Sequence, residues 1–157
     1  MMENKKILEC SSKGDTRFSP YFARVEMFGV LDSIENHYQK SKVFWLNNGT
    51  AYQIKDTKEV KGKNKRKDLG DIIGVSVNGM LLQPKYLTPL YNCLWIKYLD
   101  ENEHLVEYAK EFEDFSDMFN HGNSINCQAD TIRQYIKQGR ASFFKNETMK
   151  EFLKFLK

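Results

Sequence analysis

The stretch TPLYNCLWIKYL (88–99) decides the fold, because it predicts a long and largely buried helix. Thr88-Pro89 is typical of a helix start, since a proline in the first turn lacks only an N–H that the helix does not use. The apolar side chains then recur at four-residue spacing, as Leu90, Leu94 and Tyr98 with Tyr91 and Trp95 beside them. This spacing places them on one face of a helix and predicts a core element.

Helical patterns continue toward the C-terminus. The polar stretch 100–104 interrupts the pattern, and an apolar face then continues as far as Phe112. A polar connection follows over 119–130, and a short helix over 129–139 ends at Gly139. The last predicted helix, 146–157, has Asn146 as its cap.

Strand-like segments dominate the chain before Thr88. They cover residues 5–10, 21–31, 51–56 and 72–82, and Asn78-Gly79 within the last of them predicts a two-residue hairpin turn. One helix is expected among them, from Ser33 to Leu46, ended by the Asn-Asn-Gly of 47–49. The sequence therefore predicts an α+β fold with strands mainly in the first half and helices in the second. We expect a single domain over 1–157, because this length suits one hydrophobic core.

The composition is that of an ordinary soluble protein, with 41% hydrophobic and 29% charged residues. Three widely spaced cysteines and three histidines form no metal-binding motif, so neither a metal nor a disulfide framework is expected. No run approaches the roughly 20 apolar residues of a membrane span, and no signal peptide is evident. We therefore expect a cytoplasmic protein that makes no membrane contact, and the oligomeric state stays open.

The stretch KGKNKRK (61–67) holds five basic residues and no acid, in a chain whose net charge is only +3. Such a segment can attract phosphates at one place, including those of a nucleic acid. The same composition is also typical of a solvated loop that binds no phosphate. A single basic segment without a known binding motif falls short of a nucleic-acid-binding signature.

The stretch DSIENHYQKSKVFW (32–45) carries the first candidate site. Glu35, Gln39 and Lys42 fall at i, i+4 and i+7, so a helix would place them on one face. Ile34, Tyr38, Ser41 and Trp45 would form the core face of the same helix. The polar face is either the solvent side of a surface helix or the wall of a site where a carboxylate acts.

The preceding segment CSSKGDTRFSPYFA (10–23) is rich in groups that bind anions and sugars, interleaved with aromatic rings. The polar candidates for substrate binding are Ser11, Ser12, Lys13, Arg17 and Ser19, and the candidates for stacking on a base are Phe18 and Tyr21. Convergent polar groups beside aromatic walls are typical of small-molecule sites. A network of turns and caps would use the same residue types.

These two stretches together resemble the first signature of the NADAR family, in which an FSNF segment precedes an (S/T)VEHxYQxxKF helix. Residues 17–22 correspond to the first element and residues 33–44 to the second, with matching Ser, Glu, Tyr, Gln, Lys and Phe. The stretch LYNCLWIKYLDENEHLVEYAKEF (90–112) is similar to a second helical block of the family. The resemblance covers roughly residues 10–115 in the correct order.

The resemblance implies an N-glycosidase acting on ADP-ribosyl or ribosyl-phosphate compounds, including ADP-ribosylated guanine in DNA. No cofactor is expected, because the sequence lacks clusters of ligand residues. It also implies that Glu35 is the catalytic carboxylate. The family's closing Asp-x-x-Trp-Gly segment is absent, and SINCQAD (124–130) stands where it is due. Asn126, Gln128 and Asp130 of that stretch are therefore the remaining substrate-binding candidates.

Two functions follow from these residues. The first is hydrolysis, because a carboxylate beside ribose can stabilise an oxocarbenium-like transition state or accept a proton from the attacking water. Lys42 would favour the ionised carboxylate, and Ser11, Ser12, Lys13 and Arg17 would suit phosphates. The second is a binding module that recognises ADP-ribose or a related nucleotide without turnover, which the missing Trp-Gly segment favours. Modified DNA is a candidate partner of the hydrolase through the basic segment.

Overall fold

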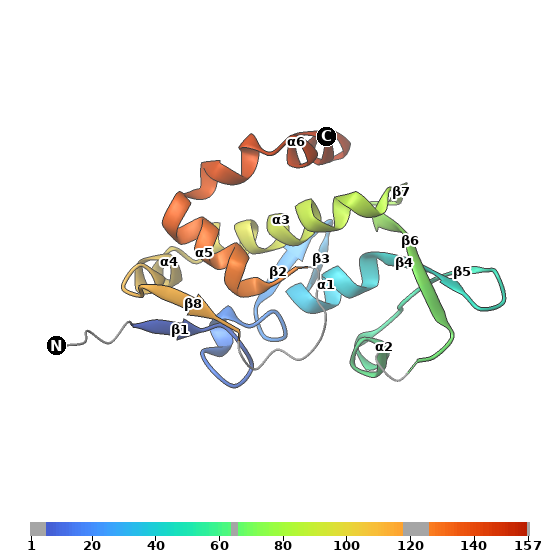
Figure 1. The fold of residues 1–157 in the computed structure, drawn as a ribbon, viewed down its shortest axis with the longest axis horizontal. Helices are drawn as coiled ribbons and strands as arrows, with labels where there is room; N and C mark the ends of the chain where they lie inside the picture. The colour runs from blue at the N-terminus through green and yellow to red at the C-terminus, as the bar shows by residue number, and fades with distance from the viewer. Residues whose placement is uncertain (1–5, 64–65, 118–125, 157) are drawn as a thin grey trace.

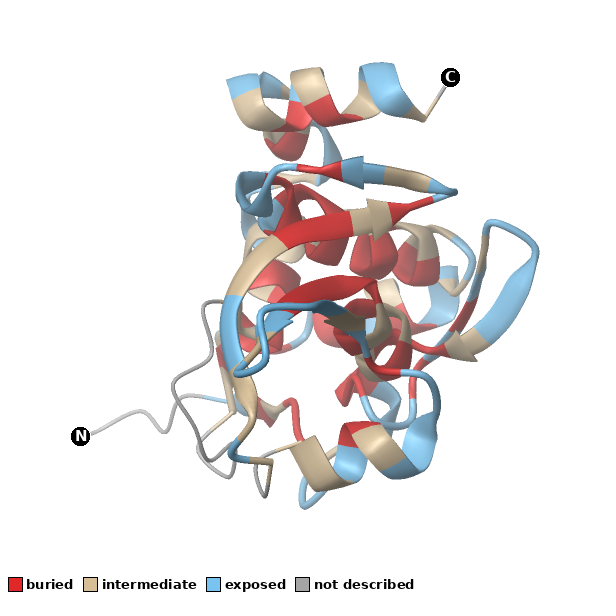
Figure 2. Cartoon of the chain, turned by 90° about the vertical axis from the view of Figure 1, so that its right-hand side faces the viewer, coloured by how far each residue is buried: buried red, intermediate tan, exposed pale blue. Residues whose placement is uncertain are grey.

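Helix α3 (Leu87–Asp100) runs through the middle of the molecule, and the other elements pack around it (Figure 1). The structure is a computed structural model that describes residues 6–63, 66–117 and 126–156. Nine residues of α3 are buried, among them Leu94, Trp95 and Leu99 at 0% exposure. A helix that is apolar on nearly all sides must be covered on nearly all sides. Figure 2 shows the buried residues gathered on this helix and the strands and helices that face it.

The order of elements confirms the α+β fold, with strands mainly in the first half and helices later. The strands are β1 (Ile7–Glu9), β2 (Arg24–Met27), β3 (Val30–Ser33), β4 (Lys42–Leu46), β5 (Ala51–Gln53), β6 (Leu69–Val77), β7 (Met80–Leu82) and β8 (Asp114–Ser116). The other helices are α1 (Ile34–Ser41), α2 (Thr57–Gly62), α4 (Glu103–Ala109), α5 (Gln128–Gln138) and α6 (Glu147–Phe155). Short 3₁₀ helices are η1 (Thr16–Phe18), η3 (Pro84–Tyr86) and η4 (Arg140–Lys145).

The largest sheet is antiparallel and has the order β5-β4-β6-β7. The predicted hairpin turn at Asn78-Gly79 is confirmed, with φ angles of 48° and 82° that a glycine or asparagine accepts with little strain. Buried Val75 and Val77 of β6 turn toward the main core, whereas Phe44, Ile54 and Val60 form a small second cluster.

The helix expected over Ser33–Leu46 is too long, because the chain leaves α1 after Ser41 and enters β4 directly. The segment KVFWL is β-branched and aromatic, and it pairs with β5 on one side and β6 on the other. The hydrogen bonds of two strand ladders stabilise these residues more than one further helical turn would. Trp45, predicted on the core face of the helix, is accordingly 46% exposed on the strand.

The strand expected over 21–31 is a hairpin, in which β2 and β3 are joined by a turn at Phe28-Gly29. The strand expected over 5–10 pairs in parallel with β8, an element that the sequence pattern did not predict. This pairing joins the N-terminal segment to the chain beyond α4.

The segment 61–67, expected as a loop, begins within a helix. Lys61 and Gly62 end helix α2, whose first turn is capped by the Asp56 carboxylate accepting from the Glu59 N–H at 2.9 Å. Residues 64–65 lie outside the described residues. The polar connection expected over 119–130 lies largely outside them too, and its end from Gln128 onward belongs to α5.

The C-terminal helices lie across α3 (Figure 1). Asn146 caps α6 as predicted, since its Oδ1 accepts from the Met149 N–H at 3.0 Å. Gly139 ends α5 with a φ of 92°. Thr88 is not the cap of α3, because η3 runs into the helix and places Tyr86 at the cap position.

Candidate functional site

Helix α1 is fixed at its first turn by side-chain and backbone contacts. The Ser33 hydroxyl accepts from the Asn36 N–H at 3.0 Å, so Ser33 is the N-cap. The Glu35 N–H donates to the Pro20 carbonyl at 2.9 Å, which ties the loop after η1 to the start of α1. Asn36 also donates to Thr57 of α2 at 2.8 Å. These contacts hold Glu35 where the loop, α1 and α2 meet.

A chain of hydrogen bonds leads from the Glu35 carboxylate to the basic segment. Gln39, one turn along α1, donates its Nε2 to Glu35 Oε1 at 3.0 Å. Its Oε1 accepts from the Lys63 Nζ at 2.8 Å. Gln39 is only 7% exposed, so this geometry is held by packing as well as by hydrogen bonds. Lys63 thus reaches into the site from beyond the end of α2, and it orients the amide that orients the carboxylate.

Lys42 lies inside the protein, at 8% exposure, with its Nζ 4.5 Å from the centre of the Tyr38 ring. None of the ion pairs within residues 6–63, 66–117 and 126–156 includes Lys42. The pKa of Lys42 is lowered to about 7, mainly by burial and also by the neighbouring Lys63 charge, while Glu35 opposes the shift. A large fraction of Lys42 is therefore an uncharged amine near neutral pH.

A small polar cavity of about 30 Å³ adjoins Glu35. Its lining residues are Pro20, Tyr21, Glu35, Tyr38, Gln39, Tyr91, Asn126 and Gln128. The amide of Asn126 donates to the Tyr38 hydroxyl at 2.7 Å, and the Tyr38 and Tyr91 rings meet edge to face at 4.9 Å. Such a volume accommodates one or two water molecules among polar partners. The cavity thus joins four parts of the chain: the loop after η1, α1, α3 and the start of α5 (Figure 1).

Five of the residues expected at a site line this cavity, namely Tyr21, Glu35, Gln39, Asn126 and Gln128. Lys42 adjoins it through the Tyr38 ring. Gln128 is 4% exposed, and its Nε2 donates to the Cys10 carbonyl at 2.7 Å, which is a structural hydrogen bond between α5 and the N-terminal segment. Tyr21 is 54% exposed and presents a ring at the cavity mouth.

The structure does not bring the other candidates to the cavity. Phe18 is fully buried and cannot stack on a base in this conformation. Arg17 makes a bidentate pair with Asp15, at 2.9 and 2.6 Å, and lies over the Tyr108 ring. The cause is local, because Asp15 caps η1 by accepting from the Arg17 N–H and this turn directs Phe18 inward.

The remaining polar candidates have structural partners or lie apart from the cavity. The hydroxyl groups of buried Ser11 and Ser19 accept from the backbone N–H groups of Lys13 and Tyr21. The Asp130 carboxylate pairs with Arg133 at 2.7 Å. Ser12 and Lys13 are exposed and do not line the cavity.

Three residues of the site were not among the expected ligands: Tyr38, Lys63 and Tyr91. Tyr38 and Tyr91 lie at helical core spacing, and the structure shows that their core faces also border the cavity. Lys63 carried no signal beyond its place in the basic segment, since only the tertiary fold brings it to Gln39.

A model of the DarT1-associated NADAR antitoxin family matches residues 1–157, so the chain belongs to this family. The match confirms the resemblance and extends it over the whole chain, including the stretch that lacks the Trp-Gly segment. Membership links the chain to a toxin–antitoxin system based on ADP-ribosylation. None of the curated proteins compared with the chain matches it. Within the part of the chain that the structure describes, no helix is long and apolar enough to cross a membrane.

Lys42→Met should stabilise the protein, most strongly at low pH. Below pH 7 the wild type must bury a charged amine, and replacing a buried ion by an apolar side chain of similar size can add about 1–4 kcal/mol to the free energy of unfolding. Between about pH 7 and 10.5 the unfolded chain binds the Lys42 proton and the folded chain does not, so this residue makes wild-type stability rise with pH. The advantage of the variant should therefore shrink over that window.

Urea unfolding at pH 6 and pH 9 measures this difference. Lys154→Met, at an exposed position of α6, is the matched control and should show no such pH dependence. A Lys42→Met protein less stable than the wild type at pH 6 would show that the buried amine is not a destabilising charge.

Proposed function

We propose that this NADAR antitoxin family member hydrolyses the N-glycosidic bond between ADP-ribose and a base, with ADP-ribosylated guanine in DNA as the substrate. One arrangement carries the proposal. Two hydrogen bonds, from Gln39 to Glu35 and from Lys63 to Gln39, hold the Glu35 carboxylate beside the buried amine of Lys42. We further propose that residues 1–157 form a single domain that acts in the cytoplasm, where it would meet the modified DNA.

The reaction replaces a base by water at C1′ of the ribose. The C1′–N bond breaks, a C1′–O bond forms, and one proton passes from the water to the leaving nitrogen. The Glu35 carboxylate can stabilise the oxocarbenium-like charge on the sugar and accept the proton of the water. The cavity at Glu35 has the size and the polar lining for that water.

Lys42 supplies a second group that can transfer a proton near neutral pH. With a pKa of about 7 it is partly protonated there, so it can protonate the leaving nitrogen in one step and recover the proton in the next. Its neutral form is also a nucleophile. In that route the amine forms a bond to C1′ as the C1′–N bond to the base breaks, and one amine proton goes to the base. Ring opening then gives an imine, which water hydrolyses to release ADP-ribose and the free lysine.

The pocket residues have matching roles in this proposal. The exposed ring of Tyr21 would stack on the base at the cavity mouth. The amides of Asn126 and Gln128 would hold ribose hydroxyls, and Ser12 and Lys13 remain exposed for the phosphates. Arg17, Phe18, Ser11, Ser19 and Asp130 have no part in it, because they are buried or engaged elsewhere.

A non-catalytic ADP-ribose-binding module is the second candidate. The missing Trp-Gly segment favours it. With either function the side chains around the cavity must move to admit a sugar, because about 30 Å³ admits only water. Such a protein would bind ADP-ribose and release nothing from modified DNA.

Glu35→Gln should leave the fold and ligand binding nearly intact and lower turnover by on the order of 10²-fold or more, because it removes a charge needed in the transition state. The measurement is release of ADP-ribose from a DNA oligonucleotide carrying ADP-ribosylated guanine, with ADP-ribose binding followed in parallel. Glu113→Gln, an exposed position outside the cavity, is the matched control. Borohydride added during turnover would attach ADP-ribose to Lys42 if the imine route operates.

Two outcomes would contradict this assignment. Binding of ADP-ribose without release by the wild type would favour the binding module. Equal turnover by the wild type and Glu35→Gln would mean that the carboxylate takes no part in the chemistry.

The role of the basic segment can be tested separately. Lys61 and Lys67 are exposed, whereas Arg66 is paired with Asp68 and Lys63 with Gln39. The double variant Lys61→Gln/Lys67→Gln should weaken the salt dependence of kcat/KM on duplex DNA, with a log–log slope smaller by about 2. Lys145→Gln/Lys154→Gln, with the same charge change on other elements, should leave the slope unchanged. Equal slopes for both double variants would exclude a specific DNA contact through this segment.

A further inference from the structure

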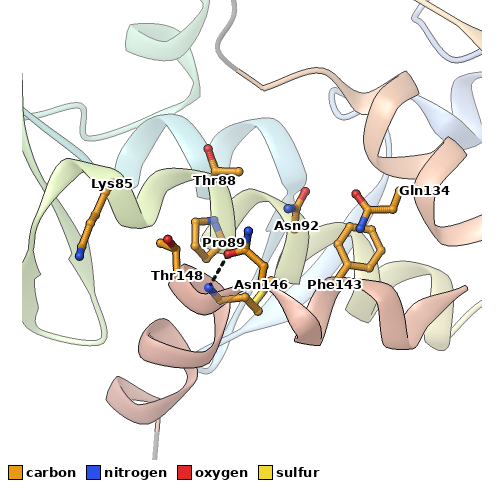
Figure 3. Close-up of a pocket in the computed structure, with 9 residues that line it drawn as sticks. Lys85, Thr88, Pro89, Asn92, Gln134, Phe143, Asn146 and Thr148 are labelled. Atoms are coloured by element: carbon orange, nitrogen blue, oxygen red, sulfur yellow. Dashed lines mark hydrogen bonds between the residues drawn. The ribbon is translucent and has the colours of Figure 1, made fainter. Parts of the chain in front are cut away.

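A second cavity, of about 300 Å³, lies between α3 and the C-terminal helices. Thr88 and Asn92 of α3, Gln134 of α5, and Asn146 and Thr148 at the start of α6 contribute to its lining (Figure 3). It does not overlap the Glu35 cavity, because the neighbouring α3 residues Tyr91 and Asn92 point about 100° apart and line different cavities. Its volume is at the lower end of the range for small-molecule sites.

The floor of this cavity is apolar and its walls are neutral. Its apolar lining consists of Pro89, Phe143 and Met149, all buried, the last two at 2% exposure. Pro89 and Phe143 are labelled beside the polar side chains in Figure 3. The one charged lining residue, Lys85, pairs with Glu151 at 3.1 Å, so its charge is compensated. The chemistry of the cavity therefore suits a neutral ligand with an apolar face and a polar edge.

Each of the three amides uses one of its two ends for the fold. Asn92 Oδ1 accepts from the Thr131 hydroxyl at 2.9 Å, and Asn146 Oδ1 accepts from the Met149 N–H at 3.0 Å. Gln134 Nε2 donates to the Ser142 hydroxyl at 3.1 Å.

These bonds fix the orientation of the amides and leave their other ends available. Within the described residues, Nδ2 of Asn92, Nδ2 of Asn146 and Oε1 of Gln134 make no hydrogen bond, and none of these atoms is among the buried unpaired ones. The cavity thus presents two amide donors and one amide acceptor above an apolar floor.

We propose that this cavity binds a purine base, as a free nucleoside or within a single-stranded nucleic acid. A purine presents ring nitrogens and carbonyl groups as acceptors, together with N–H donors, at the edge of a flat apolar ring, and carboxamides are the side chains that pair with such edges. The ring would lie on Pro89, Phe143 and Met149, as bases stack on apolar and aromatic surfaces. This site is independent of the Glu35 chemistry.

The test uses the full chain labelled with nitrogen-15 and follows the side-chain amide signals of Asn92 and Asn146 during titration. The probes are guanosine, adenosine, a short single-stranded purine oligonucleotide, and ribose as the control without a base. We expect a nucleoside to move both signals with a Kd of about 1 mM, typical for so small a ligand, and ribose to move neither. Tighter binding of the oligonucleotide than of the nucleosides would identify nucleic acid as the source of the base.

Thr88→Trp should fill the cavity and weaken nucleoside binding at least about tenfold. Thr88 is exposed and its hydroxyl makes no hydrogen bond within the described residues, so the change removes no structural contact. Thr16→Trp, at an exposed threonine of η1, is the matched control and should bind as the wild type does. If Thr88→Trp does not fold, Gln134→Met tests the same site, because Ser142 keeps its bond to the Gly139 carbonyl at 2.7 Å.

The proposal fails if no nucleoside moves the Asn92 and Asn146 signals at about 10 mM, or if Thr88→Trp binds as tightly as the wild type. It also fails if the nucleoside moves the Gln39 amide signal instead, because the ligand then occupies the Glu35 cavity. None of these results bears on release of ADP-ribose from DNA, so the glycosidase assignment stands or falls on its own test.

Discussion

Burial of α3 on nearly all its sides is the constraint on which the rest of the structure depends. Nine of its side chains must leave water, and no single layer could cover them. The hairpin of β2 and β3, helix α1, and helices α4 to α6 each cover part of the surface. This packing places Tyr38 of α1 against Tyr91 of α3, with the start of α5 beside both. The Glu35 cavity lies where these elements meet.

The junction between α1 and β4 gives the site its chemistry. Because the helix stops at Ser41, Lys42 begins a central strand and its amine is carried into the interior beside the Tyr38 ring. A lysine in the last turn of a surface helix would extend into water and keep an ordinary pKa. Here the cost of burying the charge, together with the neighbouring Lys63, produces an amine that changes protonation near neutral pH. The same Lys63 steadies Glu35 through Gln39, so one side chain acts on both members of the pair.

Patterns within single elements predicted much of this arrangement. The cap at Asn146, the turn at Asn78-Gly79 and the buried face of α3 follow from local chemistry and were confirmed. The close approach of Gln39 to Glu35 follows from helical spacing alone. Whether Glu35 is catalytic remains a prediction.

The features that the sequence did not predict depend on contacts between residues that lie far apart in the sequence. Pairing with two strands converts the end of a predicted helix into β4, a choice made by β5 and β6 and not by residues 42–46 alone. In the η1 turn Arg17 pairs with Asp15 and Phe18 is buried, although both residue types are common in nucleotide sites. The approach of Lys63 to Gln39 exists only in the tertiary structure.

Titration of the Lys42 amine by NMR, in the wild type and in Lys63→Met, is the most direct test that burial and the Lys63 charge lower the pKa of Lys42. We expect a wild-type pKa near 7 that rises when the Lys63 charge is removed; an ordinary value near 10.5 in both proteins would show that neither burial nor Lys63 shifts this amine.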